Sequence, residues 1–172
     1  DGRPRPIQIA VWYPVQKIPG QAPPAFLRFN EYVRLITSEE TLAPASAQDE
    51  RAALVAYRDE LVRAGIPRAA ATAWMNIEMA GVKNGPPAPG RFPLALLSPD
   101  DSGATQDLAL LGEYLASHGW VVATIPATSV SAVRTPGQDS TLVKAEDQSR
   151  DLAQAMTRLA QLPQADTRRL AV

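Results

Sequence analysis

The sequence contains no cysteine, and this absence excludes a thiol nucleophile, a disulfide framework and a cysteine-bound metal. It contains a single histidine, His118, so a reaction that needs a histidine base must use this residue or take its base from elsewhere. No apolar run approaches the roughly 18 residues of a membrane-spanning helix, and the residues from Asp1 onward do not have the pattern of a signal peptide. The 17 basic residues nearly balance the 18 acidic ones and are scattered, which argues against a nucleic-acid-binding surface.

What is present is the composition of an ordinary globular domain. The chain has 172 residues, of which 45% are hydrophobic and 20% charged, and this length is enough to bury one sizeable core. Two Pro/Gly-rich stretches, residues 18–25 and 83–93, are interpreted as connecting loops. We therefore expect a single domain over residues 1–172.

Three segments have the pattern of strands in a parallel sheet. Residues 92–98 (FPLALLS) and 120–126 (WVVATIP) are continuous apolar runs, as expected of strands covered on both faces. Residues 168–172 (RRLAV) open a third strand. Because single helices separate these strands, the connections should be right-handed crossovers in a parallel sheet. An alternating segment at residues 7–13 predicts a first strand that pairs antiparallel at one edge.

Helical patterns fill most of the remaining chain. Residues 26–80 carry helical spacing, and we interpret them as a helical insertion or cap after the first strand, with Trp74, Met75 and Met79 as packing residues. Residues 105–119 and 142–163 follow the two parallel strands as amphipathic helices. The side chains expected to face the core are Leu108, Leu111 and Leu115 in the first helix, and Leu152, Ala155, Met156, Leu159 and Leu162 in the second.

The most distinctive stretch for chemistry is SPDDSG, residues 98–103, between a parallel strand and a helix. Ligands of open α/β sheets gather at the carboxyl ends of the strands, so a site is expected here. One interpretation is that Asp100 and Asp101 cap the following helix, whose N-terminus favours negative charge. Another is a Mg²⁺-dependent, phosphatase-like centre at Asp100. That interpretation is weakened because adjacent carboxylates at a strand end diverge and D-D-S-G-A-T departs from the D-x-D-G-T of haloacid-dehalogenase-type enzymes.

The remaining candidates lack partners for catalysis. His118 lies between a helix end and the amino end of a strand, which is the wrong edge of the sheet for a catalytic base, and it suits the helix dipole there. Ser98 and Ser102 have no visible base that would activate them. Ser102 and Ser129 each follow a parallel strand and are candidates for the rim of a pocket.

Four segments together resemble successive pieces of the α/β-hydrolase superfamily, and within it the esterases related to dienelactone hydrolase and platelet-activating-factor acetylhydrolase. The most specific features are LASHGW before a strand and the spacing of Asp166, Arg169 and Val172. The resemblance covers both ends and the middle of the chain, but not the helical stretch 26–80. The four segments are RPIQIAVWYP, PGRFPLALLS, LGEYLASHGWVVATIP and SRDLAQAMTRLAQLPQADTRRLAV.

This resemblance implies an incomplete α/β-hydrolase-like fold, the N-terminal part of a larger hydrolase domain. In the family, the strand that RRLAV begins runs into the G-x-S-x-G nucleophile elbow, and the Asp and His of the triad follow. The triad would then lie beyond Val172, no catalytic residue would lie in this chain, and the chain would be inert by itself.

The resemblance also assigns an oxyanion-hole backbone N–H to the loop after residue 97. The family pattern S-H-G-x corresponds here to residues 98–101, so the donor is the N–H of Asp101, with Asp100 as the alternative. A carboxylate beside a developing oxyanion repels it unless the side chain points away or is paired. The two aspartates are therefore a departure that puts an efficient oxyanion hole in doubt.

The complete protein is accordingly expected to hydrolyse carboxylic esters or related acyl compounds without a metal or organic cofactor. The alternative is a non-catalytic binding or interaction module on the same scaffold, which the missing triad favours. A third strand of five residues favours a sheet completed by a C-terminal segment or a second chain. The expected partner is a small-molecule ester, not nucleic acid or a membrane. Esterases of this group are often exported, but no residue here shows it.

Overall fold

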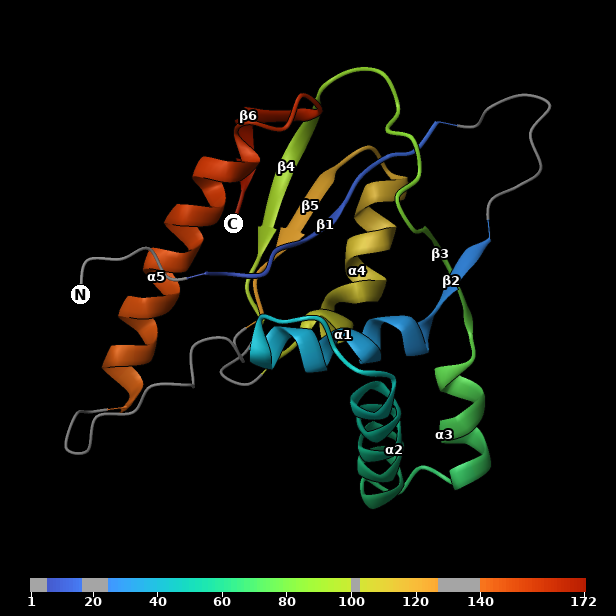
Figure 1. Ribbon diagram of the computed structural model, residues 1–172. Coiled ribbons are helices and arrows are strands. Elements are labelled where there is room, and N and C mark those ends of the chain that lie inside the picture. Colours follow the sequence, from blue (N-terminus) through green and yellow to red (C-terminus); the bar gives the residue numbers. More distant parts are fainter. Residues whose placement is uncertain (1–5, 17–24, 100–102, 127–139) are drawn as a thin grey trace.

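The computed structural model describes residues 6–16, 25–99, 103–126 and 140–172. At its centre lies a four-stranded sheet with the order β1-β5-β4-β6 (Figure 1). Strand β4 (Phe92–Leu97) runs parallel to both β5 (Val121–Thr124) and β6 (Ala165–Ala171). Strand β1 (Ala10–Trp12) pairs antiparallel with β5 at one edge. The prediction of a mostly parallel sheet with an antiparallel first strand is confirmed.

The two inner strands are apolar on both faces because helices cover both. Leu94 and Leu96 of β4 pack with α5 (Ser140–Leu159), whereas Ala95 faces the opposite cluster with α4 (Thr105–Ser117). Ala155 and Leu159 of α5 are buried as predicted, and Leu152, Met156 and Leu162 pack beside them. No helix among the described residues combines the length and apolar character needed to cross a membrane.

Residues 26–82 form three helices, α1 (Phe29–Thr41), α2 (Ala47–Arg63) and α3 (Arg68–Met75), framed by two short strands. The expectation of helical structure throughout was wrong at both ends, where β2 (Phe26–Arg28) and β3 (Glu78–Val82) pair antiparallel. A three-residue strand whose partner lies about fifty residues away leaves no periodic signal, because its pairing is decided by tertiary contacts.

Packing around this segment also differs from the helical prediction. Met79 is buried, but from β3 and not from a helix. Met75 is buried in α3, while Trp74 is 42% exposed and meets the ring of Phe29 edge-on at 5.8 Å between centroids. Of the three predicted packing residues, two are therefore in the core and one lies at its margin.

Helix α4 presents a different face to the sheet than its leucines predict. Leu111 is 44% exposed, and Leu108 and Leu115 are only half-buried. The reason is the Trp12 ring, which lies against the helix so closely that a Cβ on Gly112 would come within 2.6 Å of it. Small residues must face such a bulky ring. The buried residues of α4 are Thr105, Gln106, Ala109, Gly112, Glu113 and Ala116.

Candidate functional site

The carboxyl ends of β4 and β5 meet at one edge of the sheet, where the sequence predicts a site. The hydroxyl of Thr124, at the end of β5, donates to the Leu97 carbonyl oxygen at 2.9 Å and ties the two strand ends together. Ser98 follows β4 and is exposed, and its Oγ accepts a hydrogen bond from the Gln148 Nε2 of α5 at 2.5 Å. The candidates predicted for this edge, Asp100, Asp101, Ser102 and Ser129, lie outside the described residues.

Beyond the loop, the first turn of α4 is buried and held by two carboxylates. The Asp107 carboxylate accepts the N–H of Ala104 at 2.9 Å. Glu39, at the end of α1, has no exposed surface, and its Oε2 lies 3.4 Å from the N–H of Thr105. Ala104 is the N-cap residue, and Asp107 and Glu39 place negative charge at this helix N-terminus. The capping interpretation of Asp100 and Asp101 concerns residues outside the described ones.

Two more polar groups are buried in this first turn. The hydroxyl of Thr105 and the amide oxygen of Gln106 are inaccessible to solvent and make no hydrogen bond within the part of the chain that the structure describes. Buried polar groups without a hydrogen-bond partner are rare in folded proteins. The end of β4 and the start of α4 thus form a buried polar corner at the positive end of a helix dipole, which favours a negatively charged oxygen.

This corner contains no activated nucleophile among the described residues. The contacts of Ser98 Oγ are the Gln148 amide and the Pro99 carbonyl oxygen at 3.3 Å, and neither group is a base. Within the described ranges, no three His, Cys, Asp or Glu side chains gather as a metal site would require. Nucleophilic attack at this edge of the sheet would need residues other than the described ones.

His118 lies far from this corner, at the opposite end of α4. It is the C-cap residue, exposed, with its Nδ1 2.8 Å from the Tyr114 carbonyl oxygen and its ring against Tyr114 at 4.3 Å between centroids. Strand β5 begins three residues later. This is the amino end of the strand, as its place in the sequence predicts.

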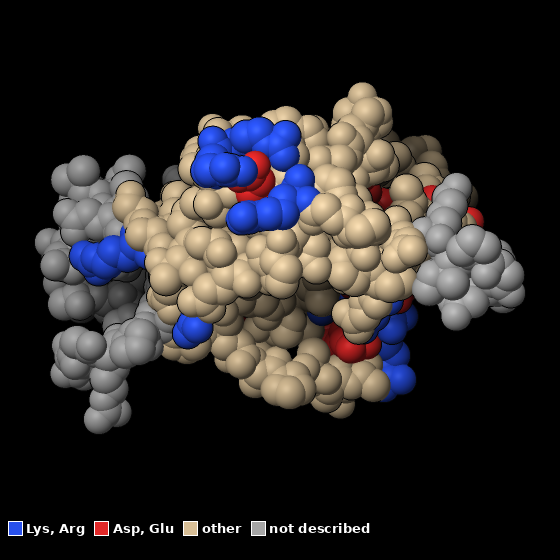
Figure 2. Space-filling model, turned by 90° about the horizontal axis from the view of Figure 1, so that it is seen from above, with Lys and Arg blue, Asp and Glu red and all other residues tan. Residues whose placement is uncertain are grey.

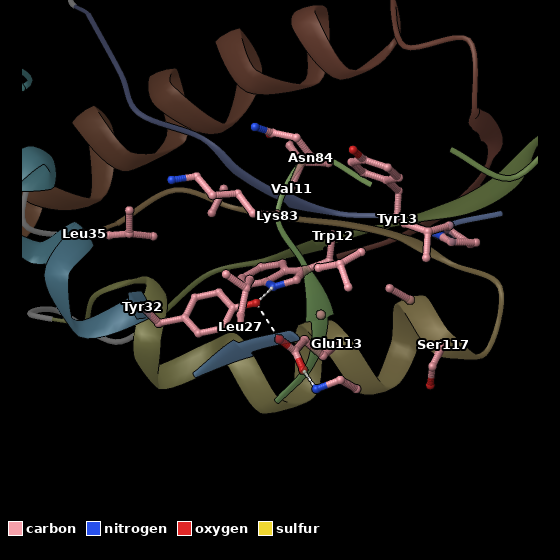
Figure 3. A pocket seen from close by; sticks show the side chains of 17 residues that line it. Val11, Trp12, Tyr13, Leu27, Tyr32, Leu35, Lys83, Asn84, Glu113 and Ser117 are labelled. Atoms are coloured by element: carbon pink, nitrogen blue, oxygen red, sulfur yellow. Dashed lines mark hydrogen bonds between the residues drawn. The ribbon is translucent and has the colours of Figure 1, made fainter. Parts of the chain in front are cut away.

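A cavity of about 320 Å³ lies beside the second half of α4 (Figure 3). Strands β1, β2 and β3 and helix α1 supply its other walls. Figure 3 shows three side chains joined along its floor by hydrogen bonds, Trp12, Tyr32 and Glu113. The cavity is therefore separated from the polar corner, which lies at the first turn of the same helix.

Every polar group in this floor network has a partner. The Trp12 Nε1–H donates to Tyr32 Oη at 3.0 Å, and Tyr32 donates in turn to Glu113 Oε1 at 2.5 Å. The second Glu113 oxygen accepts the N–H of Ala80 at 2.7 Å. Burial, followed by the hydrogen bond to Glu113, raises the pKa of Tyr32 well above its usual range. The phenol stays neutral, and the network links β1, α1, β3 and α4.

A group of arginines occupies the other end of the sheet, where β4 and β6 begin (Figure 2). Arg168 and Arg169 each bind the Asp166 carboxylate at 3.0 Å, and Arg91 donates to the Ala165 carbonyl oxygen at 2.7 Å. The hydrogen bonds from Arg168, reinforced by Arg169 and opposed by desolvation, lower the pKa of Asp166 to about 2. These contacts fix the start of β6 against β4, at the edge opposite the polar corner.

Sequence reasoning located the corner but missed its buried carboxylate. Glu39 is one of two adjacent glutamates near the end of a helical segment, and nothing in its spacing separates it from a solvated residue. Thr105 and Gln106 look equally ordinary at a helix start. Their burial results from α1 packing along α4, a contact between segments about 65 residues apart that no local pattern encodes.

The fold has a counterpart among solved structures. The chain matches a ferulic acid esterase from Streptomyces cinnamoneus with a TM-score of 0.53 and 25% sequence identity. The chain has a partial α/β-hydrolase-like fold. The match covers 94% of this chain but only 42% of the esterase. No protein-family model and no curated protein matches the sequence.

Proposed function

We propose that this chain is the N-terminal portion of a serine-type hydrolase that acts on carboxylic esters or related acyl compounds. The observation that carries the proposal is the likeness to the ferulic acid esterase, which extends over 94% of the chain. Because 58% of that esterase lies outside the match (100% less the 42% covered), the proposal assigns the nucleophile, base and acid to parts of the complete protein beyond Val172. This chain alone is then inert.

The role proposed for this chain is to stabilise negative charge on the substrate's carbonyl oxygen. Support comes from the polar corner, where the loop after β4 leads into the buried first turn of α4. Backbone N–H groups at a helix N-terminus bind anions well, and by resemblance the donor is the N–H of Asp101 or Asp100. Ser102 and Ser129 are proposed for the rim of the substrate pocket that the complete protein would form at this edge.

Sheet topology supports the proposed position of the nucleophile. Strands β4 and β6 are neighbours and parallel, with Ala95 opposite Ala171, so their carboxyl ends point to the same edge. A serine placed just after β6, as in a G-x-S-x-G elbow, would stand beside the loop that follows β4. The finer assignment, to esterases like dienelactone hydrolase and platelet-activating-factor acetylhydrolase, rests on the four sequence segments alone.

The experiment is turnover of short-chain p-nitrophenyl esters by the complete protein. We expect hydrolysis that a serine-directed fluorophosphonate abolishes and a chelator leaves unchanged, and no hydrolysis by residues 1–172 alone. Turnover that resists the fluorophosphonate but stops on chelation would favour the phosphatase-like centre at Asp100. A folded complete protein without turnover of any ester would favour the non-catalytic binding module.

A further inference from the structure

The cavity beside the second half of α4 has no role in the proposed reaction (Figure 3). Its volume of about 320 Å³ lies within the range of small-molecule binding sites. Five elements, β1, β2, β3, α1 and α4, each supply part of its wall. The residues of the polar corner, Glu39, Thr105, Gln106 and Asp107, are not among those that line it. A ligand in this cavity would therefore occupy a site separate from the corner.

The interior of the cavity offers mainly apolar surface. The polar side chains of its floor, Trp12, Tyr32 and Glu113, are already joined to one another by hydrogen bonds. A polar ligand group placed on this floor would lose its water without gaining a free partner, which is unfavourable. The interior therefore favours the apolar part of a ligand. Aliphatic side chains from four of the elements line it: Val11, Leu27, Leu35 and Val82.

The rim of the cavity is polar and carries a positive charge. Lys83, Asn84 and Ser117 line the cavity and are exposed, so it opens to solvent on their side. Lys83 directly follows β3, and Figure 3 shows its side chain extending toward Leu35 and away from Glu113. Within the part of the chain that the structure describes, the Lys83 ammonium makes no ion pair or hydrogen bond. It is thus available to an anionic group at the rim.

Glu113 determines where in the cavity a negative charge can lie. It is the one carboxylate among the described lining residues, it is only 7% exposed, and its two oxygens accept from Tyr32 and from the N–H of Ala80. An anionic group deep in the cavity would be repelled by this carboxylate. At the rim the same group would keep part of its water and meet Lys83. The charges therefore orient an amphipathic anion with its apolar part inward.

We propose that this cavity binds a small organic carboxylate, with its apolar body inside and its carboxylate at the rim beside Lys83. The rings of Trp12 and Tyr32 both line the cavity, with centroids 6.2 Å apart and planes tilted by 37°. Aromatic rings pack well against other rings in tilted or offset arrangements, so the floor favours an aromatic body. The inference does not depend on the proposed function.

The test is binding of 2-naphthoate to the complete protein by isothermal titration calorimetry, with neutral 2-naphthamide and with acetate as comparisons. We expect a Kd below about 1 mM for 2-naphthoate, weaker binding of the amide and no detectable binding of acetate. Lys83→Gln should weaken 2-naphthoate about two- to fivefold, as expected for loss of a partly exposed ion pair, and leave the amide unchanged. Arg51→Gln removes an exposed cation of α2, away from the cavity walls, and should change neither.

Methyl NMR locates the bound ligand. 2-Naphthoate should shift the resonances of Leu27, Leu35 and Val82, which line the cavity, more than those of Leu94 and Leu159, which pack on the other face of the sheet. Leu35→Trp should occupy part of the cavity and weaken the acid and the amide alike. If that variant does not fold, Lys83→Gln decides the matter, because Lys83 is exposed.

Three results overturn the proposal: no binding of 2-naphthoate, binding that Lys83→Gln leaves unchanged, or an amide that binds as tightly as the acid. Methyl shifts confined to residues outside the cavity also overturn it. Binding at the proposed catalytic centre is distinguishable, because a fluorophosphonate would block it and Lys83→Gln would not affect it. Failure of either proposal therefore leaves the other standing.

Discussion

At the scale of single residues, the phenol of Tyr32 joins three parts of the core through two hydrogen bonds. It belongs to α1, accepts from Trp12 of β1 and donates to Glu113 of α4. A phenolate in this position would face the Glu113 carboxylate with no proton to offer it. Burial and the hydrogen bond to Glu113 both disfavour the phenolate, and they therefore raise the pKa of Tyr32. The packing around Tyr32 requires the neutral phenol.

This pKa shift predicts alkaline sensitivity. Below the ordinary tyrosine pKa of 10.0, Tyr32 is neutral in both the folded and the unfolded chain and contributes its full stability. Above it, the unfolded chain releases the proton while the folded chain retains it, so the free energy of unfolding falls by up to about 1.4 kcal/mol per pH unit. Urea unfolding of the complete protein between pH 8 and 11 measures this slope.

The control for this prediction is Tyr114, a residue that is 60% exposed. Tyr32→Phe should reduce the alkaline slope. Because it removes the donor to Glu113 Oε1 and the acceptor of the Trp12 Nε1–H, it should also lower stability at pH 8 by about 1–3 kcal/mol. Tyr114→Phe should keep the wild-type slope. If Tyr32→Phe and the wild type show the same alkaline slope, the network does not hold a neutral phenol.

At the scale of elements, the packing of α4 on β1 depends on residues that a hydrophobic pattern overlooks. Ala109, Gly112 and Ala116 make a shallow face on which the Trp12 ring lies, and the larger leucines are displaced to its sides. The small size of these three residues thus allows α4 to lie close to β1.

Gly112→Ala tests this packing directly. Alanine is the better helix former by about 1 kcal/mol, but its Cβ would lie 2.6 Å from the Trp12 ring, and forced overpacking costs about 1–3 kcal/mol. We expect a net loss of stability in thermal unfolding. Leu111→Ala, one residue away and 44% exposed, should change stability by less than about 0.5 kcal/mol. The reverse order of the two effects would contradict the observed helix face.

The elements also show which features a sequence can predict. Strands β4 and β5 are predictable from their apolar runs, because doubly covered strands need continuous apolar sequence. Strand β6 lies at the edge of the sheet with residues 168–171 exposed, and RRLAV locates it only to within three residues of its start. Strands β2 and β3 were missed because neither has an alternating pattern of its own. The rotation of α4 was missed because it follows from the Trp12 ring, which belongs to a distant strand.

The candidate site is likewise predictable from the sequence only in part. Its location follows from a general property of parallel sheets, whose ligands gather at the carboxyl ends of the strands, and that property is visible in the order of strands and helices. Glu39 depends on how α1 packs along α4. Its burial beside Thr105 is therefore visible only in the folded structure.

At the scale of the whole molecule, the two ends of the central sheet differ in the polar groups they carry. The arginine group around Asp166 fixes one end of the sheet, and the buried polar corner lies at the other. The likeness to the ferulic acid esterase extends over nearly all of this scaffold and 42% of that enzyme. We propose that a serine nucleophile from the rest of the complete protein acts on the substrate at this corner.

The most direct test is to map the serine that a fluorophosphonate labels in the complete protein, by mass spectrometry of its peptides. The proposed function predicts one labelled serine, in the peptide that immediately follows β6 and therefore beyond Val172, and no label within residues 1–172. A label on Ser98, Ser102 or Ser129, or no labelled serine in an active protein, would contradict it.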